Sequence, residues 1–252
     1  MTLLSTQKLD IRIGSRTLLR ALDLHIARGQ LWCVLGRNGV GKTSLMNVLA
    51  GVLFPSEGEV LIDGVALPLM SLSELAKRRG LMPQIVTDAF SLSVLETVLV
   101  GRTPYRIGRG WDTPTDIAAA HAALTEVDLL DRCDSDIREL SGGERQRVAL
   151  ATLLVQAPDI FLLDEPTAHQ DVAHQLAMLH LLQRLSQSSA VIMNCHDINL
   201  AARFATHVLL LGEGQHWSGT AQAILQPALL QAAFGCNFRV FDDAGVTHIV
   251  AY

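Results

Sequence analysis

Residues 36–43 read Gly36-Arg37-Asn38-Gly39-Val40-Gly41-Lys42-Thr43. They match the pattern G-x-x-x-x-G-K-[ST] at every fixed position. An apolar run at 31–35 precedes them and helical spacing follows at 42–49, which predicts a strand, a glycine-rich loop and a helix. The glycines let successive backbone N–H groups point at phosphate oxygens, and the helix directs its positive end at the same anion. We therefore expect a nucleotide-phosphate site; an ordinary glycine-rich turn is the competing interpretation.

Three side chains at the end of this loop have expected roles. Lys42 can reach the β- and γ-phosphates, and the hydroxyl of Thr43 can ligate Mg²⁺. Ser44 follows directly and is expected to bind the nucleotide with them. Such a loop occurs in ATPases, kinases and GTPases, so a second site is needed to separate these classes.

Two carboxylates close a second apolar run, Ile160-Phe161-Leu162-Leu163-Asp164-Glu165. A parallel sheet places its strand ends at one edge, so these carboxylates can face the phosphates. Asp164 is expected to hold Mg²⁺ through water, and Glu165 to polarise a water molecule in line with the γ-phosphorus. The alternative is an acidic turn before Pro166.

A third motif reads Leu140-Ser141-Gly142-Gly143-Glu144-Arg145-Gln146. Ser141 and Glu144 form the Ser-x-x-Glu pattern of a helix capping box. Capping does not explain two adjacent glycines in a first helical turn, where each costs about 1 kcal/mol relative to alanine. The glycines do suit a helix end that a large anion approaches closely, because its free N–H groups can meet a γ-phosphate.

The rest of the chain predicts an α/β fold. Residues 8–26 combine apolar alternation with a turn at Gly14, which indicates antiparallel strands. Helical character dominates from 91 to 156, and short apolar runs alternate with helices after Pro158. Fully apolar strands are typical of a mostly parallel sheet covered on both faces. We therefore expect an α/β core with an inserted α-helical subdomain.

Composition restricts the possible functions. The 252 residues carry a formal net charge of −5, which argues against a nucleic-acid partner. The mean hydropathy is +0.30, yet no apolar stretch reaches the roughly 18 residues of a spanning helix, and residues 1–10 lack the pattern of a leader. If a membrane is involved, a partner supplies the spans. Four scattered cysteines favour buried thiols in a reducing compartment over disulfides.

With these motifs in place, the sequence resembles the nucleotide-binding subunits of ABC transporters over nearly its whole length. The resemblance implies a P-loop (RecA-like) core, an N-terminal antiparallel β subdomain and the helical insertion. It implies a single domain, 1–252, with its nucleotide-binding core at 1–90 and 156–220. The helical subdomain would span 91–155 and a C-terminal extension 221–252.

The resemblance also assigns roles. Residues 36–43 match the Walker A loop and 160–164 the Walker B strand, with Glu165 as catalytic base. Gln84 matches the Q-loop residue that contacts Mg²⁺ and the attacking water, and His196 matches the switch histidine at the γ-phosphate. Residues 168–171 occupy the D-loop position. By themselves, Gln84 suits any exposed loop, His196 the end of a strand, and Asp171 the cap of the helix that follows.

The family implies a composite site, because the signature at 140–146 acts on ATP held by another copy. ATP and Mg²⁺ are thus the expected cofactors, and a head-to-tail homodimer is the expected assembly. Residues 87–105 are expected to contact an integral-membrane permease, with a periplasmic binding protein as an indirect partner. The chain would work at the cytoplasmic face of the inner membrane, as the ATP-hydrolysing subunit of an importer.

Some positions depart from the family pattern, and others suggest a cargo. Ile13 stands where an aromatic residue commonly stacks on adenine, His169-Gln170 replaces an apolar pair, and Asn194-Cys195 precedes the histidine. Segments 90–105 and 234–239 resemble importers of iron-siderophore, haem and cobalamin complexes. A Gly-Arg-x-Pro turn and an aromatic tail could also serve packing alone.

Rival functions are an ABC-type ATPase of DNA repair or of translation. The first would carry long heptad coiled coils between the loop and the signature, and the second two cassettes and a basic linker. Neither feature is present in this sequence. A P-loop kinase would lack the Leu-Ser-Gly-Gly motif, and a regulatory module without hydrolysis is expected to lack Glu165 or His196.

Overall fold

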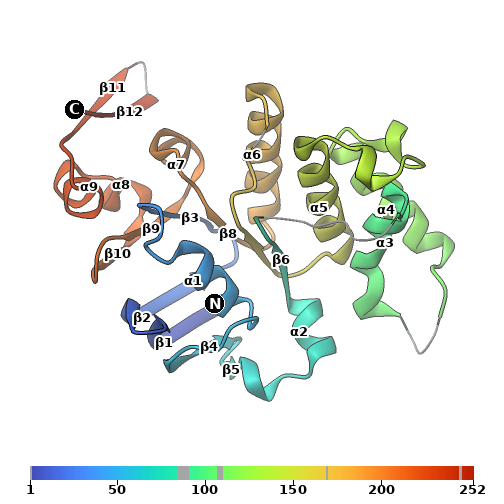
Figure 1. Cartoon of the computed structure of the whole chain (residues 1–252), viewed down its shortest axis with the longest axis horizontal. Helices are drawn as coiled ribbons and strands as arrows, with labels where there is room; N and C mark the ends of the chain where they lie inside the picture. Colours follow the sequence, from blue (N-terminus) through green and yellow to red (C-terminus); the bar gives the residue numbers. More distant parts are fainter. Residues whose placement is uncertain (1, 85–90, 107–109, 169, 244–245) are drawn as a thin grey trace.

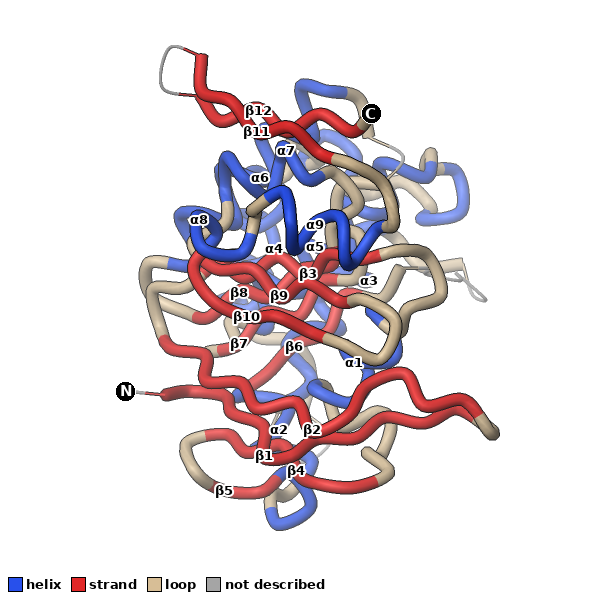
Figure 2. The backbone as a smooth tube through the Cα atoms, turned by 90° about the vertical axis from the view of Figure 1, so that its left-hand side faces the viewer, coloured by secondary structure: helices blue, strands red, loops and turns tan. Residues whose placement is uncertain are grey.

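The computed structural model describes residues 2–84, 91–106, 110–168, 170–243 and 246–252. Its layers are visible in Figures 1 and 2. In Figure 2 the N-terminal antiparallel sheet lies on one side of a six-stranded sheet, and helices α6 (Val172–Ser186) and α7 (Ile198–Phe204) lie on the other. The helical insertion of α3, α4 and α5 stands at one end of the molecule (Figure 1).

The N-terminal sheet has the order β2-β1-β4-β5 and is antiparallel throughout. Its strands are β1 (Thr2–Ile13), β2 (Arg16–Ala27), β4 (Glu57–Ile62) and β5 (Val65–Ala66). Buried and exposed side chains alternate along much of β2, as expected when one face packs on the core and the other meets solvent. The strands predicted at 8–26 are confirmed, and β1 begins earlier than predicted.

The central sheet has the order β10-β9-β3-β8-β7-β6. Its strands are β3 (Leu31–Gly36), β6 (Arg79–Met82), β7 (Ile160–Leu163), β8 (Ala190–Asn194), β9 (His207–Leu211) and β10 (His216–Thr220). All neighbours pair in parallel except β10, which is antiparallel to β9. The fold class predicted from the sequence is therefore confirmed.

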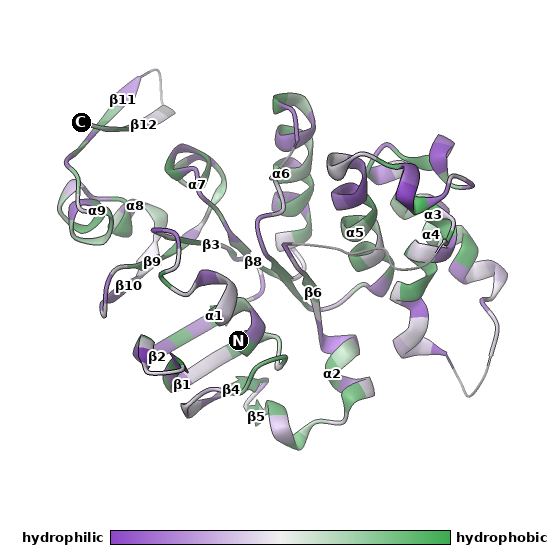
Figure 3. Cartoon of the chain, viewed as in Figure 1, coloured by the Kyte–Doolittle hydropathy of each residue, from purple (hydrophilic) through white to green (hydrophobic). Residues whose placement is uncertain are grey.

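Both faces of this sheet are buried, which explains the continuously apolar strands. Leu31, Cys33 and Leu35 of β3 belong to one hydrophobic cluster, whereas Trp32 and Val34 belong to a second. The first cluster includes residues of α6 (Val172–Ser186) and α7 (Ile198–Phe204), and the second includes α1 (Lys42–Leu49) and the N-terminal sheet. Figure 3 shows the apolar residues concentrated along the central strands.

The helical insertion leaves the sheet after β6 and returns at β7. Its elements are α3 (Val94–Leu99), the 3₁₀ segment η2 (Val100–Tyr105), α4 (Pro114–Glu126), η3 (Leu130–Arg132), η4 (Ile137–Glu139) and α5 (Gly142–Gln156). Ser93, Thr113 and Ser141 each begin a helix with a complete capping box, which satisfies N–H groups that the first turn leaves unpaired. Apolar faces of all three α-helices join the first cluster.

Segment 101–105 contains the Gly-Arg-x-Pro turn, for which the sequence left open a role in packing alone. In the structure this segment is held against the helical insertion. The side chain of Arg102 donates to Asp116 (2.7 Å) and to the Val155 carbonyl (3.1 Å). The Tyr105 hydroxyl donates to the Gln156 carbonyl (2.9 Å), and the Arg102 guanidinium lies 4.2 Å from the Tyr105 ring centroid. These contacts join η2 to α4 and to the end of α5.

The remaining elements flank this framework. They are η1 (Leu67–Leu69) and α2 (Leu72–Arg78) beside the N-terminal sheet, and α8 (Ala221–Ile224), α9 (Pro227–Phe234), β11 (Phe238–Asp243) and β12 (Val246–Ala251) at the C-terminus. The hairpin of β11 and β12 was not predicted. The side chain of Asn199 in α7 pairs with the Ile249 main chain through two hydrogen bonds of 2.8 and 3.1 Å. Across the described residues, no helix combines the length and apolar character required to span a bilayer.

Candidate functional site

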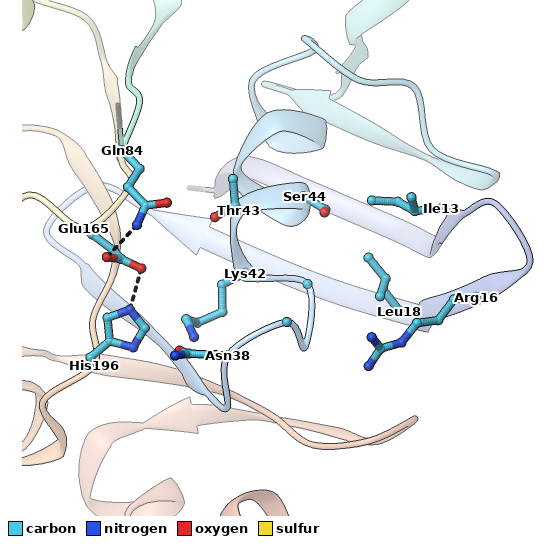
Figure 4. Close-up of a pocket in the computed structure, with 12 residues that line it drawn as sticks. Ile13, Arg16, Leu18, Asn38, Lys42, Thr43, Ser44, Gln84, Glu165 and His196 are labelled. Atoms are coloured by element: carbon cyan, nitrogen blue, oxygen red, sulfur yellow. Dashed lines mark hydrogen bonds and ion pairs between the residues drawn. The ribbon is translucent and has the colours of Figure 1, made fainter. Parts of the chain in front are cut away.

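One pocket collects residues from both sheets and from the glycine-rich loop. The hairpin of β1 and β2, the loop with the start of α1, and the segments after β6, β7 and β8 all contribute to its wall (Figure 4). Its lining residues are Ile13, Arg16, Leu18, Asn38, Gly39, Gly41, Lys42, Thr43, Ser44, Gln84, Glu165 and His196. The structure thus brings most of the predicted nucleotide and catalytic residues to one place.

The loop of residues 36–43 depends on glycine at two positions. Gly36 has φ +150°, and a Cβ there would lie 2.6 Å from the Leu211 carbonyl oxygen of the neighbouring strand β9. Gly41 has φ +116° and precedes α1, and a Cβ there would meet Leu18 at 3.0 Å. Side chains at these positions would strain the backbone and push it away from its neighbours. The loop therefore packs closely against both sheets.

Lys42 is buried inside the loop. Its Nζ donates to the carbonyl oxygens of Gly36 (2.8 Å) and Arg37 (3.2 Å). Burial lowers the pKa of Lys42, while the negative charges of Glu165 and Asp164 act in the opposite direction. Two loop carbonyls therefore hold the ammonium group in place beside the predicted phosphate position. Such a fixed cation suits the charge of a triphosphate.

Glu165 lies at the centre of a three-residue hydrogen-bonded group. Gln84 Nε2 donates to one carboxylate oxygen (2.9 Å), and His196 Nε2 contacts the other. The three residues follow β6, β7 and β8, so the parallel order of the sheet brings them to one edge. They face Lys42 and Asn38 across the pocket in Figure 4.

The backbone of Glu165 is also unusual. Its φ of +54° lies in the left-handed region, which costs a non-glycine residue of order 1 kcal/mol or more. Gln146 of α5 donates to the Glu165 carbonyl at 2.9 Å, and the Ala168 N–H donates to it at 3.2 Å. The helical insertion therefore helps to hold the carboxylate in position. Sequence reasoning assigned Gln146 to the signature without finding this contact.

Asp164 directly precedes Glu165 and is almost completely buried. The amide nitrogen of Asn194 donates to one of its carboxylate oxygens. The side-chain oxygen of Asn194, Oδ1, has no partner among the described residues, although it is buried. An unsatisfied acceptor beside a buried carboxylate suits a site that receives a hydrated cation.

The donors at this edge fit Mg²⁺ in their chemistry. Thr43, Gln84 and Asp164 offer hydroxyl, amide and carboxylate oxygens, and Mg²⁺ prefers oxygen ligands. Within the described ranges no cluster of three His, Cys, Asp or Glu side chains could hold a metal alone. Magnesium sites are usually completed by waters and substrate phosphates.

Other predicted residues lie outside the pocket wall. Ser141, Gly142 and Gly143 form the exposed to half-exposed start of α5, and Asp171 caps α6 by accepting from the His174 N–H (2.9 Å). That hydrogen bond is the main cause that lowers the pKa of Asp171. Arg37 is exposed, and Val40 is buried in the second hydrophobic cluster. His169 and residues 87–90 lie outside the described residues.

Arg16 and Leu18 were not found from the sequence. Both lie on β2, and Arg16 is the cross-strand partner of Ile13. Alignment to the family directed attention to Ile13 alone. The signal that could have found Arg16 is the Gly14-Ser15 turn, since a tight turn places the residues on its two sides opposite each other.

Known proteins resemble this chain in both sequence and structure. The family model described as ABC transporter matches residues 19–168. The chain is 35% identical over 246 residues to the iron(3+)-hydroxamate import ATP-binding protein FhuC of Bacillus subtilis (strain 168), covering 96% of this chain and 91% of that protein. It is 39% identical over 245 residues to the hemin import ATP-binding protein HmuV of Pseudomonas entomophila (strain L48), covering 94% of each.

Solved structures of ABC transporters are similar to this chain as well. A transporter assigned to the metal-chelate type, in an inward-facing conformation, superposes with a TM-score of 0.87 at 27% identity, covering 100% of this chain and 98% of that one. The dimeric structure of a bacterial ABC transporter cassette gives a TM-score of 0.76 at 26% identity, covering 86% and 98%. The resemblance predicted from the motifs is confirmed: this chain belongs to the ABC transporter family, as an ATP-binding subunit.

Proposed function

We propose that the chain binds ATP with Mg²⁺ in the pocket of Figure 4 and hydrolyses it to energise the import of a metal chelate. The observation that carries the proposal is the placement of Glu165, hydrogen-bonded to Gln84 and contacted by His196, across the pocket from Lys42. A carboxylate held in this way can accept a proton from a water that attacks the γ-phosphorus.

The residues divide the chemistry among them. The backbone N–H groups of residues 36–43 and the Lys42 ammonium bind the phosphates. Thr43 and Asp164 would hold Mg²⁺, with Gln84 as a further ligand, and the ion would supply neutralisation of phosphate charge. Glu165 orients and deprotonates water, and His196 contacts the γ-phosphate. Asn194 keeps Asp164 in position through its side-chain hydrogen bond.

A second copy of the chain completes the site in this proposal. The start of α5 at Ser141 carries a capping box and is exposed, yet it does not line the pocket of its own chain. A helix start with two glycines suits the γ-phosphate of an ATP molecule bound by another copy. The dimeric cassette reported above supports a dimer, and we propose a head-to-tail arrangement in which Ser141, Gly142, Gly143 and Asp171 meet the partner.

The permease would bind beside the insertion. An apolar groove there is bordered by Leu81, Pro83, Thr97 and Val100, and Val100 is 54% exposed. This groove adjoins the described part of the predicted contact region 87–105, namely residues 91–105. Arg102 and Tyr105 are held to the end of α5 by hydrogen bonds, and we propose the exposed apolar positions of this segment for contact. The chain would then act at the cytoplasmic face of the membrane, with a periplasmic binding protein reached only through the permease.

The cargo class rests on the relatives. Their names give iron(3+)-hydroxamate and hemin import, and the similar transporter is of the metal-chelate type. These cargoes share a metal held by an organic chelator, and we propose that class for the system that this chain serves.

One experiment tests the site. In Glu165→Gln the amide cannot accept the proton from water, so we expect ATP turnover to fall by at least two orders of magnitude while ATP still binds. The variant should elute as a dimer with ATP and Mg²⁺, and as a monomer without nucleotide. Glu213→Gln, in the exposed turn after β9, is the matched control and should retain turnover. Undiminished turnover in Glu165→Gln would remove Glu165 from its role.

A further inference from the structure

The pocket has a second end, opposite the catalytic group. Figure 4 shows Ile13, Leu18 and Arg16 on the β1–β2 hairpin, with the phosphate loop between them and Glu165. If the phosphates of a nucleotide lie in the loop with the γ-phosphate toward Glu165, its base would extend toward this hairpin. The three side chains therefore form the wall available to the base, a surface that we call the hairpin wall.

The hairpin wall offers two aliphatic side chains and one cation. Leu18 is 8% exposed and packs against Gly41, and Ile13 is 54% exposed. Among the described residues that line the pocket, the only ring is that of His196, which lies at the catalytic end. Aliphatic groups can cover a purine, but they lack the π-stacking that gives an aromatic wall much of its affinity.

Arg16 lies where it can attract the base in place of an aromatic ring. It stands opposite Ile13 in the strand register, and its guanidinium points into the pocket (Figure 4). Arg12, on the other strand, pairs with Asp10 and Glu57. No described carboxylate lies within ion-pair distance of Arg16, so its charge is available to a ligand. A guanidinium is planar, weakly hydrated and always charged, and it stacks on aromatic faces.

We propose that Arg16 recognises the base of the nucleotide, with its guanidinium plane over the π-face of adenine and Ile13 and Leu18 along the ring edge. The inference rests on the nucleotide-binding function proposed above. It assigns base recognition to a cation–π contact in a pocket that has no aromatic side chain on the hairpin wall. A cation over a ring contributes about 0.5–2 kcal/mol, which corresponds to a change of roughly 2- to 30-fold in the dissociation constant.

The experiment measures equilibrium binding by calorimetry in the presence of Mg²⁺, with two probes, ATP and inorganic tripolyphosphate. Arg16→Ala should weaken ATP binding by roughly 2- to 30-fold and leave tripolyphosphate binding unchanged, because only ATP carries a base. Arg16→Lys keeps the charge but loses the plane, and should restore less than half of the lost binding free energy. Arg20→Ala, on the same strand and exposed outside the pocket, is the control and should bind both probes normally.

A rescue makes the assignment specific. Adding Ile13→Tyr to Arg16→Ala supplies an aromatic face on the opposite strand, and should return ATP affinity to within about threefold of the original chain. Equal losses for ATP and tripolyphosphate in Arg16→Ala would mean that Arg16 binds phosphate, which overturns the inference. Unchanged ATP binding would also overturn it. If the unaltered chain binds neither probe, the proposed function itself fails.

Discussion

Gln146→Leu separates the positioning of Glu165 from the stability of the fold. Gln146 is 7% exposed, and its Nε2 donates to the Glu165 carbonyl at 2.9 Å. Leucine is similar in size to glutamine, so the substitution removes this hydrogen bond without leaving a large cavity. Glu165 keeps its left-handed φ of +54° with only the Ala168 N–H to hold its carbonyl.

The expected effects on stability nearly cancel. Loss of a hydrogen bond of this kind costs about 1 kcal/mol. The side-chain oxygen of Gln146, Oε1, however, is buried without a partner among the described residues, and removing an unsatisfied acceptor returns about 1 kcal/mol or more. We therefore expect the free energy of unfolding to change by less than about 1 kcal/mol. Catalysis depends on geometry more steeply, and a carboxylate displaced by a fraction of an ångström should lower kcat by roughly ten- to a hundredfold.

The assay pairs urea unfolding, followed by circular dichroism, with steady-state ATP hydrolysis. Gln156→Leu is the matched control, because Gln156 ends the same helix and donates to main-chain carbonyls of Ala76 (2.6 Å) and Arg79 (3.0 Å), away from the pocket. That control should lose stability and retain kcat. The reasoning is refuted if Gln146→Leu keeps kcat within twofold, or if both variants lower kcat equally through a general loosening of α5.

Two further substitutions test the loop and the insertion. Gly36→Ala should lower ATP affinity by at least tenfold and destabilise the fold by roughly 2 kcal/mol or more, because its Cβ would lie 2.6 Å from the Leu211 carbonyl oxygen. Calorimetry measures the affinity and urea unfolding the stability. Unchanged values of both would contradict the close packing of Gly36 against β9. Asp116 has a pKa lowered from 3.8 to about 2, first by the Thr113 hydroxyl and main chain and then by Arg102. The unfolded chain therefore binds the proton more readily, so the stability that ionised Asp116 contributes is complete above about pH 4 and is lost as the pH falls toward 2. In Asp116→Asn the free energy of unfolding should depend less steeply on pH between about pH 4 and pH 2. The same steepness in the variant and in the original chain would show that the Asp116 carboxylate does not contribute.

The sequence predicted those parts of the molecule in which local pattern and chemistry agree. The predicted strand at 160–163 matches the structure because its apolar run ends at a charged residue, Asp164. The predicted helix start at Lys42 matches because a glycine, Gly41, directly precedes the helical spacing. Ser141 caps α5 as predicted, because a capping box is a local interaction. The family and the fold class, both inferred from these motifs, are confirmed. The catalytic and binding roles of individual residues remain predictions.

Contacts between distant segments could not be predicted in the same way. Asn194 reaches Asp164 because β7 and β8 are neighbours in the parallel sheet. Gln146 reaches Glu165 because α5 packs against β6, the other neighbour of β7. The hairpin at 238–251 escaped prediction because its strands contain exposed aromatic and charged residues without a clean alternation. Arg16 was missed because the family pattern points to Ile13 alone, although the Gly14-Ser15 turn sets Arg16 opposite that residue.

Strand β3 has a consequence for how the protein melts. Its odd-numbered side chains fill the cluster beneath α6 and α7, and its even-numbered ones fill the cluster that the N-terminal sheet covers. A strand that forms the inner wall of two compartments cannot leave one of them without opening the other. Loss of either hydrophobic cluster therefore removes the packing around Gly36, the last residue of β3. Heat or denaturant should then unfold the chain and abolish phosphate binding in one concerted transition.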